Sequence, residues 1–346
     1  MYKSAHFHSL DKETFSFDLP EDRKFRIMQL TDCHLGYGKL SESQDTKAEK
    51  AITTLIEREK PDLIIITGDL IYPVLPKSGT LSNDREMREF MQFMDGFKIP
   101  YASVLGNHDS EMGSKATREE IGDILETGEY SIFRKGPDSI FGVGNYTINL
   151  NRKGKTEFVL AMLDSNMYGD GWFYTGFDCI HRDQTDWCME KIRKAGEKNR
   201  KLSAFMFFHM PLPEYKEAYE KMKMGDHSVK YNFGSVLEKN EYFGITNREC
   251  NVFDEALKTG FIKGMFCGHD HLNTISMEYK GICLTYGMSI DYLAYPNIES
   301  RYTQRGATVM DILPDGKTEM YLSPLGPVVS KKVRGKSRDI KRKGLL

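Results

Sequence analysis

Five short runs rich in metal-ligating residue types lie in order along this chain. Each run comes directly after a stretch that is typical of a buried β-strand. Because the carboxyl ends of neighbouring strands meet at one edge of a sheet, we expect the runs to gather where the strands of one sheet end and to form a two-metal site. The runs are Asp32-Cys33-His34, Gly68-Asp69, Gly106-Asn107-His108-Asp109, the single His209, and Gly268-His269-Asp270-His271.

The spacing within the runs suits metal binding. In a strand, residues two apart face the same way, so Asp32 and His34 can bind one ion, and the last run places two histidines in the same relation. The carboxylate of Asp69 has two oxygens and can bridge two ions, as an imidazole cannot. Each match is weak alone, since Gly-Asn pairs commonly form turns and a buried histidine such as His209 is more often a core residue. Their joint occurrence at strand ends supports the prediction.

The first half of the chain has the pattern of a parallel α/β sheet. Residues 25–31 and 63–66 are predicted strands, and residues 43–59 between them carry apolar side chains at helical spacing. A helix over residues 84–95 and a strand over residues 101–105 repeat this unit. The first three runs therefore follow three strands that we expect to lie side by side.

The second half of the chain changes pattern. From Tyr130 onward, Gly and Asn turns indicate short antiparallel strands. No linker divides the chain, so we expect one domain over residues 1–325 that is built on two stacked sheets. Further strands are predicted at residues 158–163, 203–208, 262–267 and 282–286, with helices at residues 182–194 and 253–258.

Two segments stand apart from this pattern. Residues 211–250 form the longest connection and begin beside His209, which favours a lid or a wall of the substrate site. A surface insertion with a helix of its own is the alternative. Residues 326–346 are predicted to form a flexible basic tail, because residues 331–346 hold eight Lys or Arg and one Asp.

Composition limits the classes of protein that the chain can represent. The 346 residues include 48 Lys or Arg and 50 Asp or Glu, so the balance of charge shows no bias toward nucleic acid or membrane surfaces. The six cysteines include no C-x-x-C pair, which indicates reduced thiols. The N-terminus lacks the apolar core of a signal peptide and no apolar run is long enough to span a membrane, so we expect a cytoplasmic protein.

As a set, the five runs resemble the calcineurin-like metallophosphoesterase superfamily, whose pattern is D-x-H, G-D, G-N-H-[DE], a single H, and G-H-x-H. The resemblance extends from residue 25 to residue 287. The sequence at residues 209–215 and 268–273 is similar to the purple-acid-phosphatase-like subgroup. The resemblance implies an α/β (α+β) fold, an αββα sandwich in which two mixed β-sheets are flanked by helices.

The same resemblance implies a role for each site residue. His108 would be the catalytic histidine beside the phosphate, and Asp109 would orient an imidazole, with a cap on the following turn as the alternative. Tyr72 completes the G-D-x-x-Y string of purple acid phosphatases, but D-x-H already supplies an imidazole, so we expect neither a Tyr72 ligand nor a purple colour. One ion would be bound by Asp32, His34 and His271, and the other by Asn107, His209 and His269, with Asp69 bridging.

Carboxylate, amide and imidazole ligands without a thiolate suit Mn, Fe or Zn. We expect in-line attack on phosphorus by a hydroxide that bridges the two ions. His108 would stabilise the phosphoryl oxygens or protonate the leaving oxygen. A phosphomonoester, either a small molecule or a phosphoprotein, is the favoured substrate.

Two other functional classes stay open. One is a phosphodiesterase or nuclease that acts on nucleotides or nucleic acid, for which the basic tail is the hint. The other is a non-catalytic metal-binding module, which predicts loss of a ligand or of His108, and neither is lost in this sequence. A P-loop nucleotide site is excluded, because the G-x-x-x-x-G-K-[ST] motif is absent.

Overall fold

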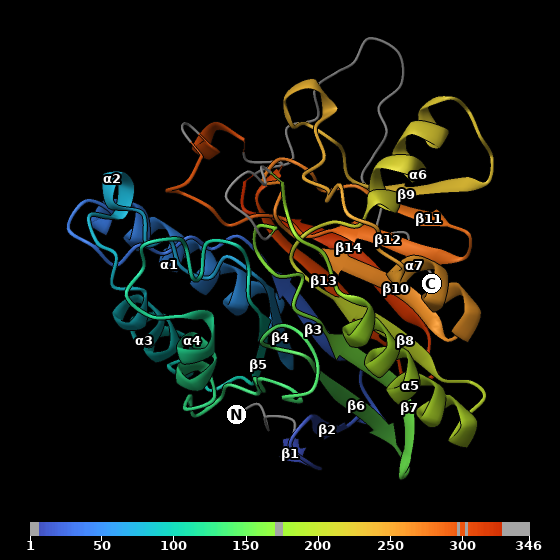
Figure 1. The fold of residues 1–346 in the computed structure, drawn as a ribbon. Helices are drawn as coiled ribbons and strands as arrows, with labels where there is room; N and C mark the ends of the chain where they lie inside the picture. Colours follow the sequence, from blue (N-terminus) through green and yellow to red (C-terminus); the bar gives the residue numbers. More distant parts are fainter. Residues whose placement is uncertain (1–6, 170–175, 296–297, 302–303, 327–346) are drawn as a thin grey trace.

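Two β-sheets lie face to face between two layers of helices (Figure 1). The computed structural model describes residues 7–169, 176–295, 298–301 and 304–326. The smaller sheet has five strands in the order β14 (Thr318–Pro324), β13 (Gly306–Ile312), β3 (Phe25–Leu30), β4 (Leu63–Thr67) and β5 (Tyr101–Val104). The three strands β3, β4 and β5 are parallel, as the α/β pattern of the first half predicts.

The larger sheet contains nine of the described strands and is also mixed. Its parallel centre, from β7 to β12, is flanked on both sides by antiparallel pairs. Its order is β1 (Phe7–Ser9), β2 (Thr14–Asp18), β6 (Tyr146–Arg152), β7 (Lys155–Met162), β8 (Ser203–Phe207), β10 (Ile262–Cys267), β12 (Ile282–Tyr286), β11 (Ser276–Tyr279) and β9 (Val229–Phe233).

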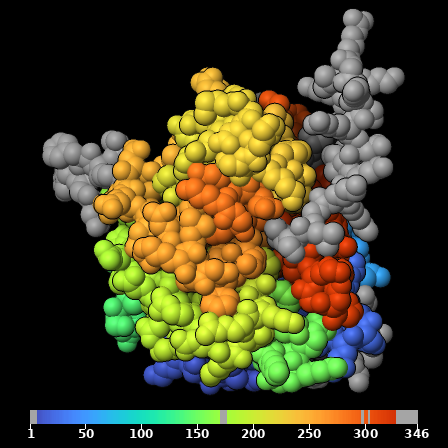
Figure 2. All heavy atoms as spheres, turned by 90° about the vertical axis from the view of Figure 1, so that its right-hand side faces the viewer, coloured from blue at the N-terminus to red at the C-terminus, as the bar shows by residue number. Residues whose placement is uncertain are grey.

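Helices cover the outer face of each sheet. On the smaller sheet lie α1 (Glu42–Glu59), α3 (Asn83–Asp95) and α4 (Arg118–Leu125), with the short α2 (Leu75–Ser78) beyond them. On the larger sheet lie α5 (Arg182–Lys198), α6 (Pro213–Lys223) and α7 (Val252–Thr259). Figure 2 views the molecule from the side of this second layer, with α6 in yellow near the top and α5 in yellow-green below. The αββα sandwich that the resemblance implies is confirmed.

The buried second half of strand β7, from Phe158 to Met162, shows why its sequence is continuously apolar. Phe158 and Leu160 point into the core between the two sheets, whereas Val159 and Ala161 point into the core beneath α5 and α7. A strand that is covered on both faces has no solvent side and therefore no polar alternation. The strands that precede the metal-ligating runs are buried in the same way, so their ends are fixed by packing on both sides.

The structure corrects one expectation about topology. The runs do not follow strands of one sheet, because β3, β4 and β5 belong to the smaller sheet and β8 and β10 belong to the larger one. Contacts between the loops after these strands join the two sheets, since the backbone N–H of His269 donates to Asp32. The site is therefore built across both sheets.

The sequence prediction contains no strand beyond residue 286, and the structure adds the antiparallel hairpin of β13 and β14. Residues 211–250 contain α6 and the edge strand β9, which pairs with β11. The predicted basic tail lies outside the described residues, apart from residue 326. No helix in the described part of the chain has the length and apolar composition to span a bilayer.

Candidate metal centre

Loops after five buried strands bring the predicted ligands together, and their backbone is unusual. Asp32, His34, Asp69 and His269 have φ angles of 49°, 48°, 51° and 74°, in the left-handed region that side chains other than Gly rarely adopt. The sequence analysis expects residues two apart to share one face of a strand, and the structure differs from this expectation. Left-handed turns direct each side chain inward instead, and such strain clusters at functional sites.

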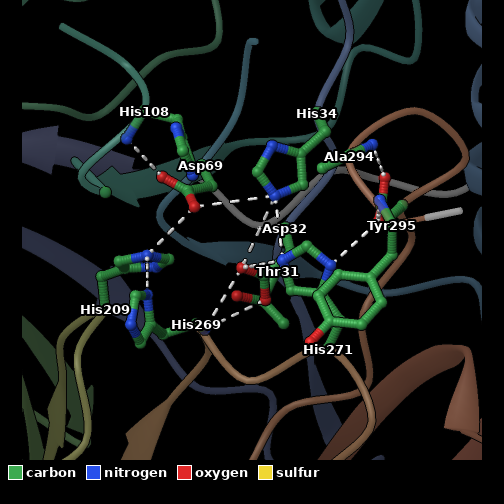
Figure 3. A network of polar contacts seen from close by, with 12 residues as sticks. Thr31, Asp32, His34, Asp69, His108, His209, His269, His271, Ala294 and Tyr295 are labelled. Carbon is green, nitrogen blue, oxygen red and sulfur yellow. Dashed lines mark hydrogen bonds and ion pairs between the residues drawn. The ribbon is translucent and has the colours of Figure 1, made fainter. Parts of the chain in front are cut away.

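The first cluster contains Asp32, His34, Asp69 and His271, all of them buried (Figure 3). Nε2 of His34 lies 3.1 Å from Nε2 of His271 and 3.6 Å from Oδ2 of Asp69. Nε2 of His271 lies 3.5 Å from Oδ1 of Asp32. Two imidazole nitrogens and two carboxylate oxygens therefore converge on one point.

The second cluster shares Asp69 with the first and adds His209 and His269. Nε2 of His209 lies 3.2 Å from Oδ2 of Asp69 and 3.3 Å from Nδ1 of His269. The side-chain oxygen of Asn107 lies 3.1 Å from the same Nε2. All seven predicted ligands thus lie in two adjacent groups, divided as the resemblance implies.

One buried oxygen indicates that the donor set fits two cations. Oδ2 of Asp69 is buried and has no hydrogen-bond partner among the described residues, although imidazole nitrogens of both clusters surround it. An unsatisfied buried carboxylate oxygen costs free energy unless a cation balances it. Its position between the clusters suits a carboxylate that bridges two ions.

The histidines compensate for the clustered negative charge in the structure as described. Burial opposes a charge on His271, but Asp291 and Asp32 outweigh burial and raise its pKa to about 10. Asp69 acts in the same way on His209 and raises its pKa to about 9. Burial lowers the pKa of His34 to about 3. Cations at the two clusters would take over the role of the protons on His209 and His271.

Partners outside the clusters set the orientation of two imidazoles. Nδ1 of His271 lies 2.8 Å from Oδ2 of Asp291, and Nδ1 of His209 lies 2.8 Å from the backbone oxygen of Thr67. An Nδ1–H that donates outward leaves Nε2 free to bind a metal. The sequence analysis does not identify Asp291, whose position after β12 is its only signal.

Asp109 plays a different part from the one first expected. It contacts no imidazole; its two oxygens accept backbone N–H donations from Asp69, Leu70, Ile71 and Gly106. Four donations to one buried carboxylate fix the turn after β4 that carries Asp69. The alternative role, a cap on a turn, is therefore closer to what the structure shows. The turn is the one that carries Asp69, however, and not the one that follows Asp109.

His108 lies at the rim of the centre. Its backbone N–H donates to Oδ1 of Asp69 at 2.8 Å, and Nδ1 of its partly exposed ring hydrogen-bonds with the carboxylate of Glu111. The Asn107 amide donates to the hydroxyl of Tyr168, which lies on the same side. The sequence analysis misses Glu111 and Tyr168, since neither belongs to a motif.

The sequence profile of the calcineurin-like phosphoesterases matches residues 25–273, the range that contains both clusters and His108. This chain belongs to the calcineurin-like phosphoesterase family. Membership supports a phosphatase-type hydrolase with a dinuclear metal site, and it confirms the resemblance drawn from the five runs.

Individual relatives of this phosphoesterase agree with that placement. Phosphatase DCR2 of Saccharomyces cerevisiae is 30% identical over 293 residues, which are 79% of this chain and 48% of the yeast protein. The chain therefore spans about half the length of that relative. Probable inactive purple acid phosphatase 29 of Arabidopsis thaliana is 27% identical over 301 residues, which are 79% of this chain and 73% of that protein.

A solved structure of a dimetal phosphatase from Danio rerio has a similar fold. Its TM-score with this phosphoesterase is 0.57 at 10% identity, over 88% of this chain and 98% of that chain. At that identity the likeness concerns the fold alone.

Three residues in or beside the motifs of this phosphoesterase lie outside both clusters. The Tyr72 ring packs edge-on against His34 and His108, and burial raises the pKa of its hydroxyl to about 12. The Asp270 carboxylate accepts hydrogen bonds from Tyr286 and from a backbone N–H. Cys33 is buried in the hydrophobic core. None of the three belongs to either cluster.

Proposed function

We propose that this phosphoesterase hydrolyses phosphate esters, with monoesters as its preferred substrates. The observation that supports this proposal most directly is the position of Oδ2 of Asp69, which lies within 3.6 Å of imidazole nitrogens of both clusters, with His108 at their rim. The assignment of ligands is part of the proposal: Asp32, His34 and His271 bind one ion, Asn107, His209 and His269 bind the other, and Asp69 bridges.

When bound, two ions at these clusters would acidify a shared water and polarise the phosphoryl oxygens. The chain itself supplies orientation and a proton. Asp109 fixes the loop of Asp69, and Asp291 fixes the ring of His271. Burial opposes a proton on His108, but Asp69 and Glu111 outweigh burial and raise the pKa of His108. A protonated His108 can donate to a phosphoryl oxygen or to the leaving oxygen during in-line attack.

A neighbouring cavity offers room for the leaving group. It has a volume of about 690 Å³, and its lining includes Tyr168, Met167, Phe141 and Lys135. The hydroxyl of Tyr168 contacts Asn107, so this side chain stands between the cavity and the second cluster. The mixture of aromatic, apolar and cationic side chains suits an organic leaving group with its own polar atoms.

Loss of activity is the main competing possibility, because three Arabidopsis relatives carry the words probable inactive in their names. A binding module would tolerate loss of a ligand or of His108, and this chain keeps all of them. The nuclease reading depends on the basic tail, which lies outside the described residues. Neither alternative gains support from a described contact.

Hydrolysis of a panel of phosphomonoesters and phosphodiesters with Mn, Fe or Zn tests this function. We expect faster turnover of monoesters, and a loss of about 100-fold or more in kcat for His108→Ala with unchanged metal content. Full metal content without hydrolysis of any ester would favour the binding module. Preferential cleavage of diesters would favour the phosphodiesterase reading.

A further inference from the structure

A third group of metal-ligating side chains lies outside the dinuclear centre, where two segments run side by side. The hydroxyl of Thr246 donates to the backbone oxygen of Phe177 at 2.9 Å. The thiol of Cys179 approaches the backbone oxygen of Glu249 at 3.9 Å, and the thiol of Cys250 approaches the backbone oxygen of Ile180 at 3.9 Å, so the two thiols lie beside each other. These contacts bring together Cys179 and Cys250, which lie about 70 positions apart in the sequence.

Three potential ligands converge at this point, and a second thiol lies beside them. Ligand atoms of Asp178, Cys179 and His181 all lie within 4.8 Å of one another. Nε2 of His181 lies 3.1 Å from Oδ2 of Asp178. Cys250 lies beside Cys179 but outside this group of three.

An arginine holds the carboxylate of this group in place. Nη1 of Arg248 lies 3.0 Å from Oδ1 of Asp178, whereas Oδ2 of Asp178 faces His181. Partners of this kind orient ligating carboxylates, and the guanidinium also balances part of the negative charge of two thiolates and a carboxylate. Both oxygens of Asp178 also lie within hydrogen-bond distance of Nε2 of His181, at 3.2 and 3.1 Å.

We propose that Asp178, Cys179 and His181 bind a zinc ion that is separate from the dinuclear centre, and that Cys250 moves onto the ion as its fourth ligand when the ion binds. Two sulfurs, one imidazole and one carboxylate make up four ligands of the types that close a tetrahedral structural zinc site. Thiolates also select zinc over Mn, which prefers oxygen ligands. The dinuclear centre contains no thiolate ligand, so the two sites differ in the chemistry of their donors.

Its position gives this third ion a role in shaping the dinuclear centre. The ring of Phe177 packs edge-on against the ring of His269 with centroids 4.4 Å apart. On the other segment, the backbone N–H of Gly244 donates to Asp270, beside the same histidine. An ion that ties Cys179 to Cys250 therefore fixes both segments that enclose His269.

Cobalt substitution tests this site without reference to activity. Apo-protein refilled with Co²⁺ should show a thiolate-to-cobalt charge-transfer band in the near ultraviolet, which the ligands of the dinuclear centre cannot produce. Cys250→Ser should abolish the band, whereas Cys188→Ala should keep it because that thiol, buried in α5, lies outside the group. Refilled with zinc, the wild type should hold about three ions per chain and Cys250→Ser about two.

Three results would overturn the proposal. One is the absence of a thiolate band in folded wild-type protein that has taken up Co²⁺ at its other sites. Another is a band of equal intensity in Cys250→Ser. The third is a disulfide between Cys179 and Cys250 in protein purified with zinc present, seen as a mass lower by the two thiol hydrogens. In that event the pair would be an oxidised crosslink and not a ligand pair.

Discussion

Oδ2 of Asp69 lies 3.2 Å from Nε2 of His209 and accepts no hydrogen bond from any described residue. The same oxygen lies 3.6 Å from His34 of the other cluster. A single carboxylate therefore connects the two groups of ligands, and its removal should affect both ions. This relationship distinguishes a dinuclear centre from two unrelated metal sites.

Asp69→Asn should weaken the binding of both ions, because the amide carries no charge and offers only one ligating oxygen. We expect kcat to fall by at least about 100-fold, more than the loss of an orienting partner usually causes. Metal analysis after dialysis provides the measurement. Asp84→Asn, which removes a carboxylate that pairs with Lys115 at the surface, is the control. Loss of one ion alone would contradict the bridging role.

Asp291→Asn should act on one ion only. The variant keeps an oxygen for the backbone N–H groups of the turn but loses the charge that faces Nδ1 of His271. We expect the affinity for one of the two ions to fall by about 10- to 100-fold, while the other ion binds as before. Calorimetric titration of apo-protein would resolve the two steps. The control is Asp315→Asn in an exposed turn.

Gly244→Ala should disturb the second cluster by a steric clash. An added Cβ would lie 2.4 Å from Cδ2 and 2.6 Å from Nε2 of His269, so the ring must move. We expect about a tenfold loss of affinity for the ion bound by His269, without loss of the fold. At Gly96 the nearest atom would lie 3.2 Å away, so Gly96→Ala serves as the matched control. Equal metal affinity in both variants would show that Gly244 is not needed for the position of His269.

Glu86→Gln should make stability less dependent on pH. Glu86 is fully buried in α3, neither carboxylate oxygen has a described partner, and burial raises its pKa from 4.5 to about 9. The folded state therefore keeps a proton that the unfolded state releases, and this group lowers stability progressively as pH rises from about 4.5 to about 9.

The measurement compares the unfolding midpoints of the wild type and the variants at pH 4 and at pH 8. Relative to wild type, the free energy of unfolding of Glu86→Gln should be higher by about 1–3 kcal/mol at pH 8 and by much less at pH 4. Glu57→Gln, a substitution at an exposed position of α1, should gain stability at neither pH. A Gln variant whose advantage is the same at both values would indicate a packing effect and not a titration.

The strands that carry the ligands could be predicted because burial on both faces leaves a continuous apolar run, as in residues 63–66 of β4. The ligands themselves followed from their place after such runs. The sequence does not reveal that these strands divide between two sheets. That division depends on how β8 and β10 pair with β7 and β12, and pairing between distant strands leaves no local pattern.

Residues that support the ligands were harder to predict. Asp291 reaches His271 from 20 positions away, and Glu111 reaches His108 through a turn, so neither is defined by a motif. The role of Asp109 was misjudged for a related reason. It follows a histidine in the sequence, but the fold places its carboxylate against backbone N–H groups of another loop.

The most direct test of the account is the return of activity to metal-free protein. Protein stripped by a chelator should not hydrolyse p-nitrophenyl phosphate, and Mn²⁺ added stepwise should restore hydrolysis in proportion to the occupancy of both clusters. Manganese is suitable because it avoids the thiolate group around Cys179. Undiminished hydrolysis by the stripped protein, or full activity with one ion bound, would contradict a dinuclear mechanism.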